Sequence, residues 1–273
     1  MKINSMHSVL GMTFLSLVLV FQNCSNAKFT SEIDPNALNS VTGVGDDGHG
    51  DDPNCHATTV NGSQIVKVLF VVDASGSNRG EGGEVPTDPN KTWRSGTMNN
   101  FINAYKARSN FYYGMITFQD SSAKPQIKVN NKGAFTNDMN VVDAGMASFN
   151  ANADGGSTPY KAALSMAKSI IAADLAANAA QKAAYVMVMV SDGMAKDYSS
   201  PDQVIPDAKA IRDLAPGQVS LNTVYYYPNA FDESQTKYLR NIASAGGGQF
   251  LTANSSQVLK IDDVIQVPGM SCQ

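Results

Sequence analysis

Five oxygen-bearing side chains follow two apolar segments and one glycine-rich turn. The apolar run that ends at Val72 leads into Asp73-Ala74-Ser75-Gly76-Ser77, and the run that ends at Val190 leads into Ser191-Asp192-Gly193. Between them, the turn Asp154-Gly155-Gly156-Ser157 precedes Thr158. The carboxyl ends of the central strands in an open α/β sheet lie at one edge, so we expect these side chains to come together there. The candidate ligands are Asp73, Ser75, Ser77, Thr158 and Asp192.

This set supplies carboxylate and hydroxyl oxygens and no nitrogen or sulfur, which is the chemistry of a hard divalent cation. We expect Mg²⁺, with Mn²⁺ or Ca²⁺ as alternatives. With only two carboxylates around it, a bound cation keeps positive charge and can accept an acidic group from a partner. Taken singly, each residue has a simpler explanation, because Asp and Ser form turns and Thr158 can cap a helix.

Common catalytic signatures are absent from the chain. Its three histidines, His7, His49 and His56, all lie in the first quarter, which argues against a Ser-His-Asp or Cys-His centre. A haloacid-dehalogenase-like phosphotransferase needs a second acid two residues after Asp73, and Ser75 stands there. A metal-dependent hydrolase needs a base beside the cation, and the sequence offers none. We therefore expect a binding protein and not an enzyme.

Alternating apolar strands and amphipathic helices predict an α/β fold with a doubly wound, mostly parallel six-stranded sheet, helices on both faces and one short edge strand. The expected strands are 65–72, 111–118, 126–129 (the short one), 185–190, 219–226 and 249–253. The expected helices lie near 98–105, 139–149, 158–178, 207–214 and from 232 onward, with a closing helix at 258–265.

In this frame the ligand set resembles the metal-ion-dependent adhesion site of von Willebrand factor type A domains. The family's D-x-S-x-S motif matches residues 73–77, its threonine matches Thr158 and its strand-end aspartate matches Asp192. The resemblance covers about 66–267 and implies a Rossmann-like sheet with an antiparallel edge strand. It also implies that Ser75, Ser77 and Thr158 bind the metal directly and that the two aspartates act mainly through water.

The resemblance implies an adhesion-type module that captures a protein ligand presenting a carboxylate. The alternative is a periplasmic or outer-membrane scaffold subunit in which the metal is structural. Beside the expected site, residues 78–92 form a long insertion before the first helix. Two interpretations stay open for it: a loop that contacts or gates the partner, or a solvated insertion that costs little in loop-closure entropy.

The N-terminal segment indicates export. Lys2 precedes an apolar run at 8–21 that is too short to span a bilayer, and Cys24 follows. The segment resembles a bacterial lipoprotein signal, although 21–23 read Phe-Gln-Asn where that family usually has Leu-Ala-Gly. We expect a signal peptide at 1–23 and a lipid anchor at Cys24. The protein would be extracytoplasmic, anchored to the outer membrane on its periplasmic or surface side, or else secreted.

Composition, charge and cysteine positions predict the domain organisation and exclude one class of partner. Residues 24–62 are rich in Gly, Asp and Asn and predict a flexible tether, followed by one domain at 63–273. In an oxidising compartment we expect Cys55 and Cys272 to form a disulfide. A net charge of −4 and an isoelectric point near 5.3 argue against nucleic acid as a partner. A 43% hydrophobic share is ample for a core.

Overall fold

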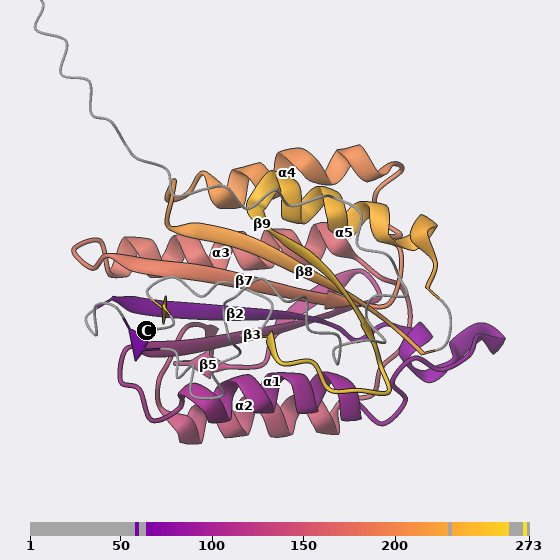
Figure 1. Ribbon diagram of the computed structural model, residues 1–273, viewed down its shortest axis with the longest axis horizontal. Coiled ribbons are helices and arrows are strands. Elements are labelled where there is room, and N and C mark those ends of the chain that lie inside the picture. Colours follow the sequence, from indigo (N-terminus) through magenta and orange to yellow (C-terminus); the bar gives the residue numbers. More distant parts are fainter. Residues whose placement is uncertain (1–57, 60–63, 229–230, 262–269, 272–273) are drawn as a thin grey trace, which may run out of the picture. The chain divides into compact units, whose positions relative to one another are not determined.

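A computed structural model describes residues 58–59, 64–228, 231–261 and 270–271, all within one compact unit, Gly50–Gln273. A six-stranded sheet in the order β4-β3-β2-β7-β8-β9 forms its centre (Figure 1). Every neighbouring pair is parallel except β3 and β4. The expected doubly wound, mostly parallel sheet is therefore confirmed. The strands are β2 (Ile65–Asp73), β3 (Phe111–Gln119), β4 (Ser122–Pro125), β7 (Ala183–Ser191), β8 (Val219–Tyr227) and β9 (Gly247–Asn254).

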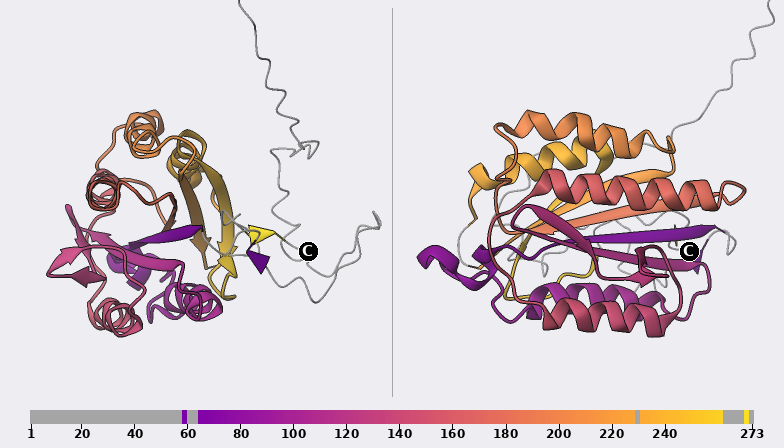
Figure 2. Two further views of the ribbon diagram at one scale, coloured as in Figure 1. Left: turned by 90° about the vertical axis from the view of Figure 1, so that its left-hand side faces the viewer. Right: turned by 180° about the vertical axis from the view of Figure 1, so that it is seen from behind.

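Five α-helices cover the two faces of this sheet within the described residues (Figure 2). The helices α1 and α2 lie on one face, and α3, α4 and α5 lie on the other. Their bounds are α1 (Thr92–Tyr105), α2 (Met139–Ala151), α3 (Tyr160–Ala177), α4 (Val204–Arg212) and α5 (Glu233–Gly246). None of the helices in the described ranges is long and apolar enough to cross a membrane.

Side-chain alternation along β2 explains why the sheet is buried on both faces. Phe70 and Val72 belong to the apolar cluster that contains α1 and α2 residues, whereas Leu69 and Val71 belong to the cluster that contains α3, α4 and α5 residues. All four side chains are fully buried. A strand with helices over both faces buries nearly every side chain, which is why β2 is apolar from Ile65 to Val72 apart from Lys67, whose buried amine pairs with Asp174.

The location predicted for the short edge strand, 126–129, is wrong. The strand that pairs antiparallel with β3 is β4, and its register joins Gln119 to Ser122 through a two-residue turn. Asp120 in that turn has φ 56°, a left-handed conformation that hairpin turns of this length require and Asp tolerates. Residues 128–129 instead form β5 (Lys128–Val129), paired with β6 (Lys132–Gly133) in a separate ribbon.

The two ends of the domain meet in a short antiparallel pair, β1 (Thr58–Thr59) with β10 (Met270–Ser271). The chain beside Cys55 is thereby brought next to the chain beside Cys272, as the expected disulfide requires. The cysteines themselves, Cys24 included, lie outside the described residues, as do the expected signal peptide and nearly all of the tether. Of the expected closing helix, residues 258–260 have no helical structure and 262–265 are not described.

Three consecutive glycines join α5 to β9. Gly247 has φ 71° and closes the helix in the left-handed conformation. Gly248 lies at a register shift against β8, where an added Cβ would come within 2.3 Å of the Leu221 carbonyl oxygen. The close approach of two backbones therefore excludes any side chain at residue 248.

Gly248→Ala is expected to lower the free energy of unfolding by roughly 1–3 kcal/mol, because backbone must move to admit the methyl group. Gly193→Ala is the matched control, since a Cβ at Gly193 meets nothing within 4 Å. Urea unfolding in metal-free buffer measures both changes. Equal stability of the two variants would show that the contact between the start of β9 and β8 is not tight.

Candidate metal-binding site

The five predicted ligands lie at the carboxyl ends of β2 and β7, which are adjacent parallel strands in the middle of the sheet. Asp73 is the last residue of β2, and Asp192 directly follows the last residue of β7. The next α-helix after β2 is α1 and the next after β7 is α4, and these helices cover opposite faces of the sheet. The chain that follows β2 and the chain that follows β7 therefore leave the sheet in opposite directions. A crevice remains between them, and this is the usual ligand site of an open α/β sheet.

Hydrogen bonds connect four of the five side chains. The Ser75 amide donates to Asp73 Oδ1 at 2.7 Å, and the Ser75 and Ser77 hydroxyl oxygens lie 3.1 Å apart. The Ser77 hydroxyl in turn donates to Asp192 Oδ1 at 2.9 Å. The other carboxylate oxygen of Asp73 accepts from the Ser191 hydroxyl. A chain of hydrogen bonds thus connects the two aspartates, and its link between Asp73 and Ser75 is made by the Ser75 backbone amide.

Thr158 reaches the site through a backbone junction. Two hydrogen bonds of 2.9 Å join the glycine-rich turn to the end of β2, from Gly155 N to Ala74 O and from Gly76 N to Gly156 O. Thr158 follows this turn and is nearly buried, with a relative exposure of 6%. The Thr158 side chain forms no hydrogen bond with the other four residues, but it lines the same cavity wall as Ser77 and Asp192.

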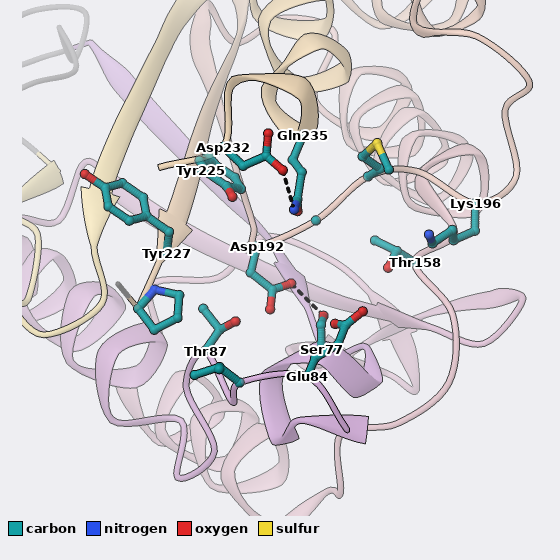
Figure 3. Close-up of a pocket in the computed structure, with 14 residues that line it drawn as sticks. Ser77, Glu84, Thr87, Thr158, Asp192, Lys196, Tyr225, Tyr227, Asp232 and Gln235 are labelled. Carbon is teal, nitrogen blue, oxygen red and sulfur yellow. Dashed lines mark hydrogen bonds between the residues drawn. The ribbon is translucent and has the colours of Figure 1, made fainter. Parts of the chain in front are cut away.

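A cavity of about 330 Å³ opens at this point (Figure 3). Ser77, Thr158 and Asp192 line one part of it, and Figure 3 shows Tyr225 and Tyr227 from the end of β8 on another. Met194 is 37% exposed and also lines the cavity, whereas the strand residues Met187 and Met189 are fully buried in the core. The cavity gives a ligand from solvent access to the hydroxyl and carboxylate oxygens.

In the ranges that the structure describes, the site contains two buried carboxylates and no directly bound cationic side chain. Asp73 is fully buried and Asp192 is 7% exposed, and the Oδ2 atom of Asp192 has no hydrogen-bond partner among the described residues. Burial, together with the negative charge of Asp192, raises the pKa of Asp73 to about 7, and burial also raises the pKa of Asp192. An unpartnered buried oxygen among oxygen donors fits a hard divalent cation. The described part of the chain contains no cluster of three or more His, Cys, Asp or Glu, so hydroxyl ligands are essential to this fit.

Behind the site, Arg94 holds the backbone in place. Its guanidinium group donates to the Asp73 carbonyl oxygen at 2.6 Å and forms ion pairs with Asp88 at 2.9 Å and Asp154 at 2.7 Å. All of these side chains are buried. Arg94 therefore links the end of β2, the start of α1 and the glycine-rich turn in one network.

Sequence reasoning did not identify Arg94 or Ser191 as parts of the site. Ser191 carried a usable signal, because it directly precedes Asp192 at the end of an apolar strand. Arg94 carried none, because an arginine in the first turn of a helix is usually exposed, and only the tertiary structure shows that it points inward.

The fold is that of von Willebrand factor type A domains. The chain is similar to proximal thread matrix protein 1 from the mussel byssus, with a TM-score of 0.53, 19% identity, and 78% of this chain and 48% of that chain covered. It is also similar to a von Willebrand factor type A structure from Catenulispora acidiphila (TM-score 0.50, 16% identity, 71% of this chain and 40% of that chain). A third similar structure is the pilus adhesin SpaC from Lactobacillus rhamnosus GG (TM-score 0.50, 15% identity, 70% and 28%).

The chain thus spans less than half the length of each of these structures, and at such identities the likeness establishes the fold alone. No family model matches the sequence, and no curated protein matches it.

Arg94→Met is expected to lower the free energy of unfolding by about 3–5 kcal/mol, because it leaves buried carboxylates without their main counter-ion. Arg240→Met is the control, since the ion pair of Arg240 with Glu233 is solvent-exposed and should contribute less than about 1 kcal/mol. Urea unfolding of both variants tests this. A loss below 1 kcal/mol for Arg94→Met would contradict a structural role for the buried network.

Proposed function

We propose that this type A domain is a metal-dependent binding module that captures an acidic group of a protein partner. The observation that carries the proposal is the chain of hydrogen bonds that connects two buried aspartates, one of which has an unpartnered carboxylate oxygen, at the wall of an open cavity. A divalent cation held there by Asp73, Ser75, Ser77, Thr158 and Asp192 supplies positive charge and an open coordination position for a carboxylate.

The five proposed ligands contribute charge and neutral donors in different ways. Asp73 and Asp192 provide the negative charge, and the hydroxyls of Ser75, Ser77 and Thr158 provide neutral donors, so the cation retains attraction for an anion. Lys196 lines the same cavity and adds a second positive charge for an acidic partner. Tyr225 and Tyr227, although nearly buried, form an aromatic part of the cavity wall, and aromatic residues are enriched in interfaces.

Two of the similar structures support this proposal. Proximal thread matrix protein 1 has also been solved with a zinc-occupied metal-ion-dependent adhesion site, on a fold that matches this chain with a TM-score of 0.50. SpaC is a pilus adhesin. For the present chain we propose Mg²⁺ from the all-oxygen donor set, with Mn²⁺ or Ca²⁺ as alternatives.

The proposed setting is extracytoplasmic. We propose cleavage of residues 1–23, a lipid anchor at Cys24 in the outer membrane and a disulfide between Cys55 and Cys272 that joins the ends of the domain. The pairing of Thr58 with Ser271 supports the disulfide, because it places the flanking chain segments side by side. In the second function, that of a scaffold subunit, the metal stabilises the loops and captures no partner.

Saturating Mg²⁺, Mn²⁺ or Ca²⁺ is expected to stabilise the wild-type chain by about 2.7 kcal/mol at a hundredfold excess over its Kd. The shift should vanish in Asp73→Ala and in the isosteric Asp73→Asn. Thermal unfolding against a chelator measures it, and a metal-free melt of each variant controls for folding. Stabilisation of the Asp73 variants equal to that of wild type would contradict the site.

Carboxylate capture is expected to depend on the metal. In a set of immobilised peptides that carry a single Glu or Asp, the Mg²⁺-loaded chain should bind members at least tenfold better than their Gln or Asn counterparts. Chelation should abolish the difference, because the attraction is to the cation. Metal stabilisation without any such preference would favour the scaffold subunit.

A further inference from the structure

The insertion between the site and α1 is attached to the site's own backbone. Both Gly80 N, at 3.0 Å, and Thr87 N, at 3.4 Å, donate to the Ser77 carbonyl oxygen, and Asp88 N donates to the Asn78 carbonyl oxygen at 3.2 Å. The segment therefore leaves and returns at the same point. Its tip, residues 81–86, is solvent-exposed and is held beside the cavity by these bonds.

Two glutamates of the tip are placed differently. The Glu81 carboxylate accepts from Gly156 N at 2.9 Å and so attaches the tip to the glycine-rich turn. The Glu84 side chain lines the cavity together with Ser77, Thr158 and Asp192 (Figure 3). No hydrogen bond or ion pair engages the Glu84 carboxylate in the part of the chain that the structure describes.

A cation would favour Glu84 in this cavity. The Glu84 and Asp192 carboxylates line the same cavity, and a positive charge between them offsets the repulsion of like charges. Glu84 is solvent-exposed, so no packing holds its side chain away from a cation bound at the same wall. Its exposure also puts the Glu84 side chain where an acidic group from solvent would reach the cavity.

We propose that Glu84 is an internal ligand of the cation, which a partner's carboxylate displaces. This inference rests on the proposed function and adds a residue of this chain's own insertion to the five expected ligands. Displacement is compatible with the loop, because Gly80, Gly82 and Gly83 adopt φ values of 75°, 81° and 88° that other residues rarely reach. Asp73, Asp192 and Glu84 do not form a three-carboxylate cluster in the part of the chain that the structure describes, so binding of Glu84 to the cation requires the tip to move inward. A Cβ at Gly82 or Gly83 would meet nothing within 4 Å, so the tip has space for this movement.

The test is Mn²⁺ binding to the full chain, followed by electron paramagnetic resonance and by water-proton relaxation. Glu84→Gln is expected to raise the Kd for Mn²⁺ about tenfold, since carboxylate count tunes affinity, and to add one coordinated water. Asp232→Asn is the matched control. It removes one charge from the same cavity, and Asn can still cap α5 as Asp232 does. We expect less than a threefold change in Kd and no added water for this control.

Acetate binding is a second test of whether Glu84 competes with an external carboxylate. Acetate should bind the Mn²⁺-loaded Glu84→Gln chain about tenfold more tightly than the Mn²⁺-loaded wild type, because no internal carboxylate competes. Equal effects of Glu84→Gln and Asp232→Asn, or an unchanged water count, would overturn the inference while leaving the metal site intact. Failure of wild type to bind Mn²⁺ would instead overturn the proposed function, and the inference with it.

Discussion

The structure depends on one electrostatic constraint, the burial of two carboxylates at the ends of neighbouring central strands. Asp73 and Asp192 lie where β2 and β7 end, and each is almost inaccessible to water. Burial disfavours the charged form of both groups and raises both pKa values, and the negative charge of Asp192 further raises the pKa of Asp73. Their hydrogen bonds come from hydroxyls and one backbone amide, and none of these carries a full positive charge. A site that concentrates negative charge in this way is suited to a cation.

The two sides of the site differ: a buried ion-pair network lies behind it, at its base, and exposed residues of the 78–92 insertion lie on its solvent side, at its front. At the base, Arg94 neutralises Asp88 and Asp154 and holds the Asp73 carbonyl, so the strand end and the glycine-rich turn cannot separate without exposing buried charges. At the front, exposed residues of the 78–92 insertion meet solvent, with glycines at the points where the chain turns. Such a division lets a ligand exchange at the front without loss of the ligand geometry behind it.

Sequence predicted most of the fold and placed the candidate site, for identifiable reasons. Apolar runs such as residues 65–72, interrupted only by Lys67, are typical of a strand that is covered on both faces, so the strand ends, and the polar residues after them, could be located from hydrophobicity. The edge strand was misplaced because β4 is polar and half-exposed and lacks that signal. Arg94 and Glu84 were missed as site residues because their roles depend on which way a side chain points, and that is decided by tertiary packing.

The most direct measurement is anomalous X-ray diffraction from crystals of the chain grown with Mn²⁺. The account predicts one strong anomalous peak at the carboxyl ends of β2 and β7, surrounded by the side chains of Ser75, Ser77, Thr158 and the two aspartates, and lost from crystals of Asp73→Ala. Absence of a peak there at saturating Mn²⁺, or a peak confined to another part of the surface, would contradict the account.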